Sequence, residues 1–312
     1  MAAALAACLA ATGALCGIWS VYGPYGLNVL FRQGGSWWIP VGTDSRWMSA
    51  SMRLALAADP VATPGEVRWR AVADGFEVAD LSALVDRREV DRVLLARIDP
   101  ARFRFEVRTA SDGGTGLDGW MSRLRPALVV NGSYTDHQGK PATPVLSGNA
   151  LLGPRTYDAK AGAFVTTPDF TGVRDLGQTG WEAAFHGATE AMVSFPLLAA
   201  NGASRVARPS RWLANRSFVG QDGEGRVVVG TTTDGFFSLH RFARFLLDAP
   251  LSLTLALNLD GGPVASQGIS LNGFSRRSYG RWEAKVEGRR AELLMWPYGH
   301  VAMPIVLAVF PK

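Results

Sequence analysis

Apolar and polar residues alternate over several short stretches in the first half of the chain, and this spacing predicts β-strands with one buried face. Glu66–Val72 alternates in this way, and the Asp74-Gly75 pair after it predicts a turn. The segment Leu117–Leu124 has the spacing of a short helix. The other strands predicted here are Phe76–Val78, Val90–Ile98, Phe103–Val107 and Ala127–Val130.

The second half of the chain continues this mixture of many strands and few helices. Arg226–Thr231 and Met303–Phe310 are predicted strands, and Leu253–Leu259 is a nearly continuous apolar run, typical of a central buried strand. Leu239–Leu247 has helical spacing, with Ser238 as its N-cap. Because the strands do not alternate strictly with helices, the pattern predicts an α+β fold of mixed β-sheets in a single domain.

The N-terminal segment has a different pattern, with no charged residue before Arg32. Ala2–Tyr22 consists mainly of apolar residues and is long enough, as a helix, to cross a bilayer. We interpret residues 1–33 as a secretory signal or a membrane anchor, although a positively charged start is missing. The alternative is a buried, alanine-rich helix of the folded domain.

Domain boundaries follow from these patterns. Residues 34–61 are rich in Gly, Ser, Pro and Ala and have weak periodicity, so we expect a linker with one short helix near Trp47–Leu56. The folded domain is expected over residues 62–312. It should be exported, either periplasmic or anchored to a membrane, with any membrane association made through residues 1–31.

The composition of the chain limits which partners, metals and catalytic groups are expected. The net charge of +5 permits an anionic ligand, but the chain has no nucleic-acid-binding motif, so no nucleic acid is expected as a partner. Its two cysteines, Cys8 and Cys16, both lie in the apolar N-terminal segment. In a helix they would be roughly 12 Å apart, which is too far for a disulfide. The folded domain therefore has no thiol for catalysis or metal binding, and no metal or cofactor is expected.

The segment Asn258-Leu259-Asp260-Gly261-Gly262-Pro263 places a carboxylate and two glycines directly after a predicted buried strand. Glycine lets the backbone turn sharply and lets a ligand approach the main chain. A catalytic acid at the strand end is one interpretation, and an ordinary Asp-Gly turn is the other. The spacing alone does not decide between them.

Two further segments also contain candidate site residues. Asn131-Gly132-Ser133-Tyr134 follows the predicted strand Ala127–Val130 and is either part of a site or a hairpin turn. Arg216 precedes a predicted turn at Asp222–Gly225, and its guanidinium suits bidentate binding of phosphate. The alternative for Arg216 is an ordinary solvated side chain.

The order of these segments along the chain resembles that of the phosphodiester glycosidase family. The resemblance extends from about Val67 to Val309, and no single motif in it is specific. The motifs are N-G-S-Y from Asn131, S-F-P-L-L from Ser194, R-S-F-V-G from Arg216, D-G-E-G-R-V-V-V from Asp222, N-L-D-G-G from Asn258 and M-P-I-V-L-A-V from Met303.

This resemblance implies a hydrolase that cleaves the bond between the anomeric carbon of a sugar and a phosphate, in an envelope or extracellular glycan. The phosphomonoester product has a second pKa near ~6, so it leaves without a strong general acid. We assign Arg216 to the phosphate, Asp260 to catalysis, and Asp234 and His137 as further catalytic candidates. The expected substrate-binding residues are Asn131, Gly132, Arg216, Asn258, Gly261, Gly262 and Ser266.

One departure from the family pattern leaves a second function open. Relatives often have hydroxyl residues directly after N-L-D-G-G, whereas Pro263-Val264-Ala265 stand here and Ser266 comes later. The alternative function is therefore a non-catalytic envelope protein that binds glycan with the same fold. A serine hydrolase is the weakest alternative, because the chain has no Gly-x-Ser-x-Gly motif.

Overall fold

A computed structural model describes residues 2–22, 38–57, 60–110, 115–136, 138–157, 161–177, 179–295 and 301–312. The chain divides into two units, Met1–Pro40 and Val41–Lys312, and each is considered by itself. The first contains helix α1 (Ala2–Tyr22), whose side chains are exposed over residues 4–16. Among the described residues, no helix combines the length and the apolar character needed to cross a bilayer.

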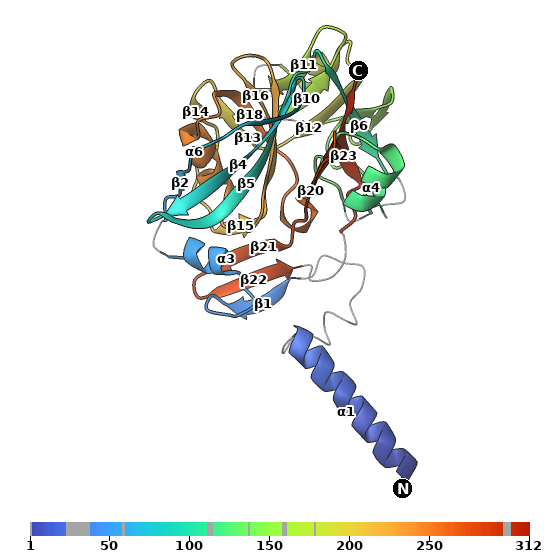
Figure 1. Ribbon diagram of the computed structural model, residues 1–312, viewed down its shortest axis with the longest axis vertical. Helices are drawn as coiled ribbons and strands as arrows, with labels where there is room; N and C mark the ends of the chain where they lie inside the picture. Colours follow the sequence, from blue (N-terminus) through green and yellow to red (C-terminus); the bar gives the residue numbers. More distant parts are fainter. Residues whose placement is uncertain are drawn as a thin grey trace. The chain divides into compact units, whose positions relative to one another are not determined.

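The second unit is built mainly from antiparallel sheets, and the largest has nine strands (Figure 1). The apolar run predicted as a central strand is β18, which lies between β13 and β16 in this sheet. In order, the sheet contains β14 (Ala203–Ser204), β13 (Leu197–Ala200), β18 (Leu253–Asn258), β16 (Ser217–Asp222), β17 (Val227–Thr232), β5 (Arg88–Ile98), β4 (Phe76–Val85) and β2 (Thr63–Pro64), and β3 (Arg70–Ala73) pairs with β4.

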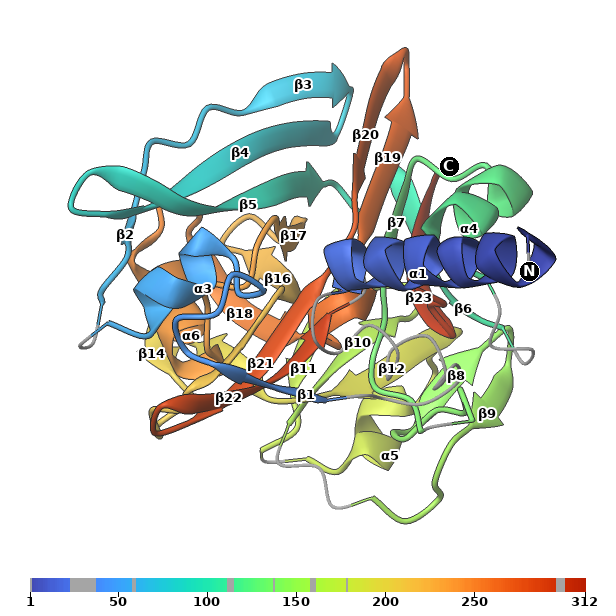
Figure 2. The same cartoon turned by 90° about the horizontal axis from the view of Figure 1, so that it is seen from below.

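Two five-stranded sheets pack with it, and β19 and β20 form a hairpin in the first of them (Figure 2). This sheet has the order β20 (Phe274–Ser278), β19 (Gln267–Leu271), β7 (Leu128–Asn131), β23 (Ile305–Pro311) and β6 (Phe103–Thr109). The second has the order β11 (Thr171–Asp175), β10 (Gly162–Thr166), β12 (Glu190–Ser194), β8 (Val145–Ser147) and β9 (Ala150–Leu152).

A four-stranded sheet carries one wall of the site described below. Its order is β1 (Ile39–Gly42), β22 (Arg290–Met295), β21 (Trp282–Glu287) and β15 (Trp212–Ala214). Helix α3 (Ala50–Ala55) lies in the segment expected to be a linker, close to the predicted helix near Trp47–Leu56. Met48 and Met52 of this segment are fully buried, so this part of it is folded.

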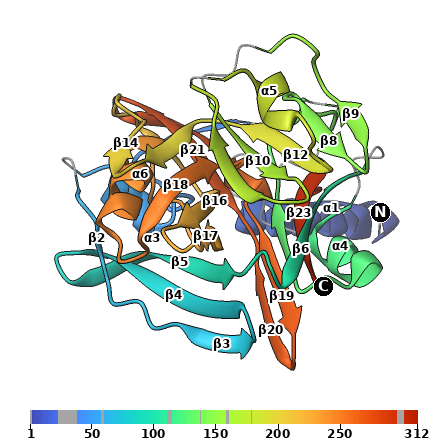
Figure 3. The same ribbon diagram turned by 90° about the horizontal axis from the view of Figure 1, so that it is seen from above.

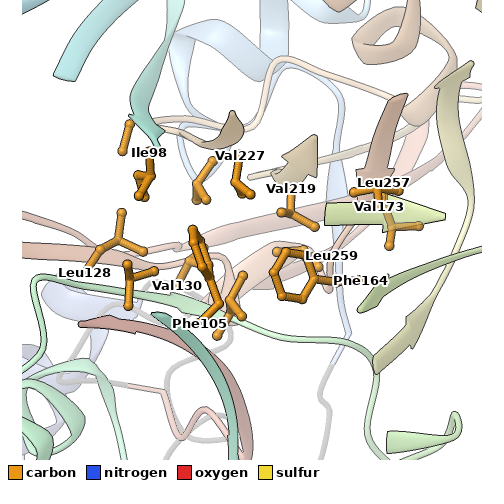
Figure 4. Packing of buried hydrophobic residues seen from close by; sticks show 14 of the residues in the cluster. Ile98, Phe105, Leu128, Val130, Phe164, Val173, Val219, Val227, Leu257 and Leu259 are labelled. Atoms are coloured by element: carbon orange, nitrogen blue, oxygen red, sulfur yellow. The ribbon is translucent and has the colours of Figure 1, made fainter. Parts of the chain in front are cut away.

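The main hydrophobic core lies where the three larger sheets meet (Figure 4). Leu257 and Val219 come from the nine-stranded sheet, Val130 from the first five-stranded sheet, and Phe164 from the second. All four side chains are completely or almost completely inaccessible to solvent. Removal of this apolar area from water fixes the three sheets against one another.

Three helices of the second unit cover outer faces of these sheets (Figure 3). Helices α4 (Leu117–Leu124) and α5 (Trp181–Phe185) pack on β7 and β10, respectively, and α6 (Leu239–Asp248) packs on β13. Helix α4 has the predicted bounds, and Ser238 caps α6 as predicted by accepting a hydrogen bond from the Arg241 amide. The prediction of an α+β fold in a single domain is confirmed.

Local differences from the predicted elements concern turns and strand ends. The strand predicted at Glu66–Val72 begins only at Arg70. Neither Asn131-Gly132 nor Asp260-Gly261 is the turn of a hairpin. β7 pairs with β19 and β23 on its two sides, and Asp260 leads into the 3-10 turn η2 (Gly262–Val264).

Candidate functional site

The ends of β7 and β18 meet at Asp260. The Asp260 amide donates to the Gly132 carbonyl at 3.0 Å, and the Asn131 Nδ2 donates to the Asp260 carbonyl at 2.7 Å. Strand β18 belongs to the nine-stranded sheet and β7 to a five-stranded sheet. Two segments that are 129 residues apart along the chain are thus joined where the buried strands end.

Three predicted substrate-binding residues have side chains that hold this backbone. The Asn131 Oδ1 accepts from the Ser266 amide at 3.2 Å, and the Ser266 hydroxyl accepts from the Gly280 amide at 3.2 Å. The Asn258 Nδ2 lies within hydrogen-bond distance of three oxygens, those of the Tyr134 hydroxyl and of the Phe195 and Leu259 carbonyls. The Asn258 Oδ1 is buried and has no partner in the described part of the chain.

Arg216 is buried at the junction of β15 and β16, with only 4% of its surface exposed. Its Nε donates to the Phe237 carbonyl at 3.1 Å, and its Nη2 donates to the Trp212 carbonyl at 2.8 Å. These bonds fix the guanidinium plane, and no hydrogen bond from Nη1 joins it to any described residue. The interpretation of Arg216 as a solvated side chain is therefore wrong.

Asn215, the residue before Arg216, fastens the strands around the site. Its Oδ1 accepts from the amides of Arg281 and Trp282, both at 2.9 Å, and its own carbonyl accepts from the Gly262 amide at 2.9 Å. Asn215 is completely buried. It therefore fixes β21 and the η2 turn against the segment that carries Arg216.

Four glycines permit the close approach of these segments. A Cβ at Gly261 would lie 3.2 Å from the Arg216 Nη1, and one at Gly132 would lie 2.5 Å from the Ile305 Cγ2. At Gly262, where φ is +70°, a Cβ would lie 2.5 Å from the Glu283 Oε2. At Gly280 it would lie 2.3 Å from the Gly262 carbonyl oxygen. Side chains at Gly132, Gly262 and Gly280 would therefore displace neighbouring atoms, and one at Gly261 would require a small shift of its neighbours.

A second carboxylate, Glu283 of β21, is close to Asp260 and Arg216. Burial and then the charge of Glu283 raise the pKa of Asp260 to about 7, against the opposing effects of the Gly261 amide and Arg216. Burial also raises the pKa of Glu283, while Arg216 and the Trp212 indole act in the opposite direction. One cation and two acids thus interact without a direct ion pair between them among the described residues.

Tyr134 is the fourth polar member of this group. Burial, and next the charge of Asp260, raise the pKa of Tyr134 above its usual range. Its hydroxyl donates to the Phe195 carbonyl at 2.8 Å and accepts from the Asn258 Nδ2 at 2.7 Å. The Tyr134 ring stacks on the Phe195 ring, with centroids 4.2 Å apart. Tyr134 therefore stays protonated and links the charged group to an aromatic surface.

Two large aromatic side chains next to this group remain accessible. Phe195 and Trp212 are each 40% exposed. The Trp212 indole nitrogen donates to the Glu283 Oε1 at 2.7 Å, and Phe195 contacts Tyr134 as described above. Partly exposed aromatic faces next to partly buried carboxylates offer one apolar and one polar wall to a ligand.

The structure does not place Asp234 among the groups that act on Asp260. Asp234 instead adjoins Asp91, whose Oδ1 accepts from the Asp234 amide at 2.9 Å and whose pKa is raised in part by the Asp234 charge. The second acid beside Asp260 is therefore Glu283 and not the catalytic candidate Asp234. His137, the other catalytic candidate, lies outside the described residues.

Sequence reasoning did not select Glu283, Tyr134, Trp212, Phe195 or Asn215 as site residues. Tyr134, Phe195 and Asn215 lie in or next to the sequence motifs named above, so their positions in the sequence could have identified them as site residues. Glu283 and Trp212 gave no such signal. They reach the site because β15 pairs with β21.

The family model for phosphodiester glycosidases matches residues 125–284, which are 160 of the 312 residues, so the chain belongs to this family. Among curated proteins, none matches the chain significantly. The fold is similar to that of the zebrafish N-acetylglucosamine-1-phosphodiester alpha-N-acetylglucosaminidase catalytic domain auto-inhibited by its pro-peptide. The two are 16% identical, 91% of each chain is covered, and the TM-score is 0.53.

A hypothetical protein from Synechocystis also has a similar fold. It is 14% identical to this chain, with 80% of this chain and 64% of the Synechocystis chain covered and a TM-score of 0.50. At these identities both likenesses concern the fold alone. The match of the family model includes the segments that carry Asp260, Arg216 and Glu283.

Proposed function

We propose that this protein hydrolyses the bond between the anomeric carbon of a sugar and a phosphate group. The observation that carries this proposal is the buried Arg216 guanidinium beside an acid, Asp260, whose pKa is raised to about 7. A fixed guanidinium suits a phosphodiester, and a carboxylate that titrates near neutral pH suits proton transfer. Membership in the phosphodiester glycosidase family supports the same reaction.

In this mechanism Arg216 holds the phosphate, and ionised Asp260 accepts a proton from water. The oxygen of this water forms a bond to the anomeric carbon while the bond from that carbon to the phosphate oxygen breaks. The electron pair of the broken bond leaves with the phosphomonoester, whose growing charge Arg216 stabilises. The leaving group needs no strong acid, because its second pKa is near ~6.

The aromatic side chains support a sugar as the other half of the substrate. Phe195 and Trp212 present exposed rings next to the acids, where the apolar face of a pyranose can pack while its hydroxyls meet polar groups. The zebrafish enzyme is by name an N-acetylglucosamine-1-phosphodiester alpha-N-acetylglucosaminidase. A glycan with N-acetylglucosamine linked to phosphate is therefore the first substrate to try.

Export is part of the proposal, with a periplasmic or membrane-anchored location. Its basis is the uncharged, mainly apolar segment before Arg32. Protease added to intact cells and to cells with a permeabilised outer envelope separates the two sides of the inner membrane. Resistance in both preparations, with digestion only after lysis, would contradict export.

The test of the reaction is release of free sugar by the full-length protein. UDP-N-acetylglucosamine and other glycosyl phosphodiesters serve as substrates, and the matching glycosyl phosphomonoesters and alkyl glycosides serve as controls. We expect turnover of the diesters only. Tight glycan binding without turnover of any diester would favour the non-catalytic alternative, for which the changed residues Pro263–Ala265 are the basis.

A further inference from the structure

Glu283 lies on β21, which is paired on both sides in the four-stranded sheet, and its carboxylate has close contacts with the site. Its Oε1 accepts from the Trp212 indole at 2.7 Å, and its Oε2 lies where a Cβ at Gly262 would come within 2.5 Å. Gly262 follows Asp260 by two residues, and its amide is held by the Asn215 carbonyl at 2.9 Å. The Glu283 carboxylate is therefore fixed against the backbone that carries Asp260.

The charged and titratable groups that interact with Asp260 come from three parts of the chain. Glu283 belongs to β21, Arg216 lies between β15 and β16, and Tyr134 follows β7. The Asp260 carboxylate accepts one hydrogen bond from the described residues, from the Gly261 amide at 2.9 Å. Among the described groups that act on Asp260, Glu283 is the only other acid.

We propose that Glu283 is a positioning residue of this site, whose negative charge beside Gly262 controls how strongly Asp260 binds a proton. This inference rests on the function proposed above. Glu283 forms and breaks no bond in the reaction. In the reaction step, the proton passes from water to Asp260, and Glu283 makes that transfer more favourable by repelling the negative charge of the ionised acid.

Trp212 favours the ionised form of Glu283, against burial, which raises the pKa of this acid. The indole N–H can only donate, so its bond to the Glu283 Oε1 favours the carboxylate. Arg216 acts in the same direction. Each of the two acids thus accepts one hydrogen bond within the described part of the chain, Glu283 from the indole and Asp260 from the Gly261 amide.

The substitution Glu283→Gln tests the proposal, because glutamine keeps an acceptor for the Trp212 indole and removes the charge. The acidic limb of the kcat/KM profile should move to lower pH by about one unit, the shift expected for loss of a nearby like charge. The matched control is Glu287→Gln on the same strand, where the side chain is exposed, and its limb should not move. An unchanged limb in Glu283→Gln, with turnover retained, would overturn the proposal.

A second readout does not depend on turnover. Infrared difference spectra of the full-length protein between about pH 5 and pH 9 follow the protonated carboxyl band, which Asp260→Asn identifies by its loss. In the native protein the two interacting acids titrate as a pair. In Glu283→Gln the band that is lost in Asp260→Asn reports Asp260 without its partner acid, and its midpoint should lie about one unit lower.

These two readouts separate failure of the function from failure of the inference. If the native protein cleaves no glycosyl phosphodiester, the proposed function fails, and the infrared midpoint still decides the role of Glu283. If turnover is present and neither midpoint moves, only the role of Glu283 fails. Trp212→Phe removes the indole donor and keeps a ring, so a smaller shift in the same direction is expected.

Discussion

Two aspartates of this protein, Asp91 and Asp260, have pKa values that are raised mainly by burial, but they differ in their partners. Burial raises the pKa of Asp91 to about 8 and that of Asp260 to about 7. Asp91 accepts hydrogen bonds from the amides of Arg92, Asp234 and Phe236 and from the Thr233 hydroxyl. Asp260 accepts one from the residues that the structure describes, from the Gly261 amide, and adjoins a second acid and a fixed cation.

The difference teaches that burial of an acid does not by itself identify a site. The acceptor capacity of the Asp91 carboxylate is filled by the Thr233–Phe236 turn, so its role is to hold this turn in place. Asp260 retains unused acceptor capacity next to Arg216 and two accessible aromatic rings. Substitutions at the two positions should therefore have opposite balances of activity and stability.

The strongest test of this contrast is Asp260→Asn. Turnover of a glycosyl phosphodiester should fall by at least about 10³-fold, because an amide cannot accept the proton. Thermal unfolding near pH 4 should change little, since the Gly261 amide still finds an acceptor. An unchanged rate in this variant would end the assignment of Asp260 as the catalytic acid–base group.

Arg216→Lys comes next in expected effect. Lysine keeps the charge but loses the planar fork that binds the Phe237 and Trp212 carbonyls, so kcat/KM should fall by about 10²-fold. The neighbouring exposed Arg281 supplies the control, because only its backbone amide is used at the site. Equal losses in Arg281→Lys and Arg216→Lys would point to general destabilisation.

Asp91→Asn should affect stability more than chemistry. An asparagine would place an amide among backbone donors, and the free energy of unfolding should fall by about 2 kcal/mol. Turnover per folded molecule should fall less than about tenfold, since Asp91 touches none of the reacting groups. Chemical denaturation and active-site titration measure the two quantities separately. A loss of turnover as large as that of Asp260→Asn would remove the contrast.

The pH dependence follows from the raised pKa of Asp260. As a base it works in the ionised form, so kcat/KM should fall about tenfold per pH unit below about 7. Stability should respond with the opposite sign. The folded state holds the proton more tightly than the unfolded chain, so the contribution of Asp260 to stability is lost as pH rises from about 4 to about 7. The melting temperature of Asp260→Asn, relative to that of the native protein, should therefore rise over this pH range.

The smallest expected effect is that of Phe195→Ala. Loss of one exposed ring should raise KM about fivefold for a sugar substrate, equivalent to ~1 kcal/mol, with kcat nearly unchanged. The comparable exposed side chain away from the site is Leu54, and Leu54→Ala should leave both constants as they are. A fall in kcat rather than a rise in KM would contradict a role of Phe195 in binding.

Elements with strong local signals could be predicted from the sequence. Helix α4, the Ser238 cap of α6 and the buried strand β18 each depend on residues close together along the chain. The sheet order could not be predicted in this way, because pairs such as β17 with β5 join residues more than a hundred positions apart. Strand β4 extends to Val85 because β5 provides a partner along its whole length.

The site residues also differ in how well they could be predicted from the sequence. Asp260 and Arg216 could be selected because each stands at a strand end within a motif, and the structure brings both to one place. Glu283 stands in an alternating strand segment that has no distinctive residue, and only the pairing of β21 with β15 brings it there. Asp234 was easier to select from the sequence than Glu283, but in the structure it lies beside Asp91.

The contact between Gly280 and the η2 turn limits how this site can be altered. The backbone at Gly280 approaches the Gly262 carbonyl so closely that even a methyl group has no room. A larger residue at position 280 would push the η2 turn away from β21 and so separate Asp260 from Glu283. Redesign for another sugar should therefore vary the aromatic rim at positions 195 and 212, and should leave the tight pair of glycines untouched.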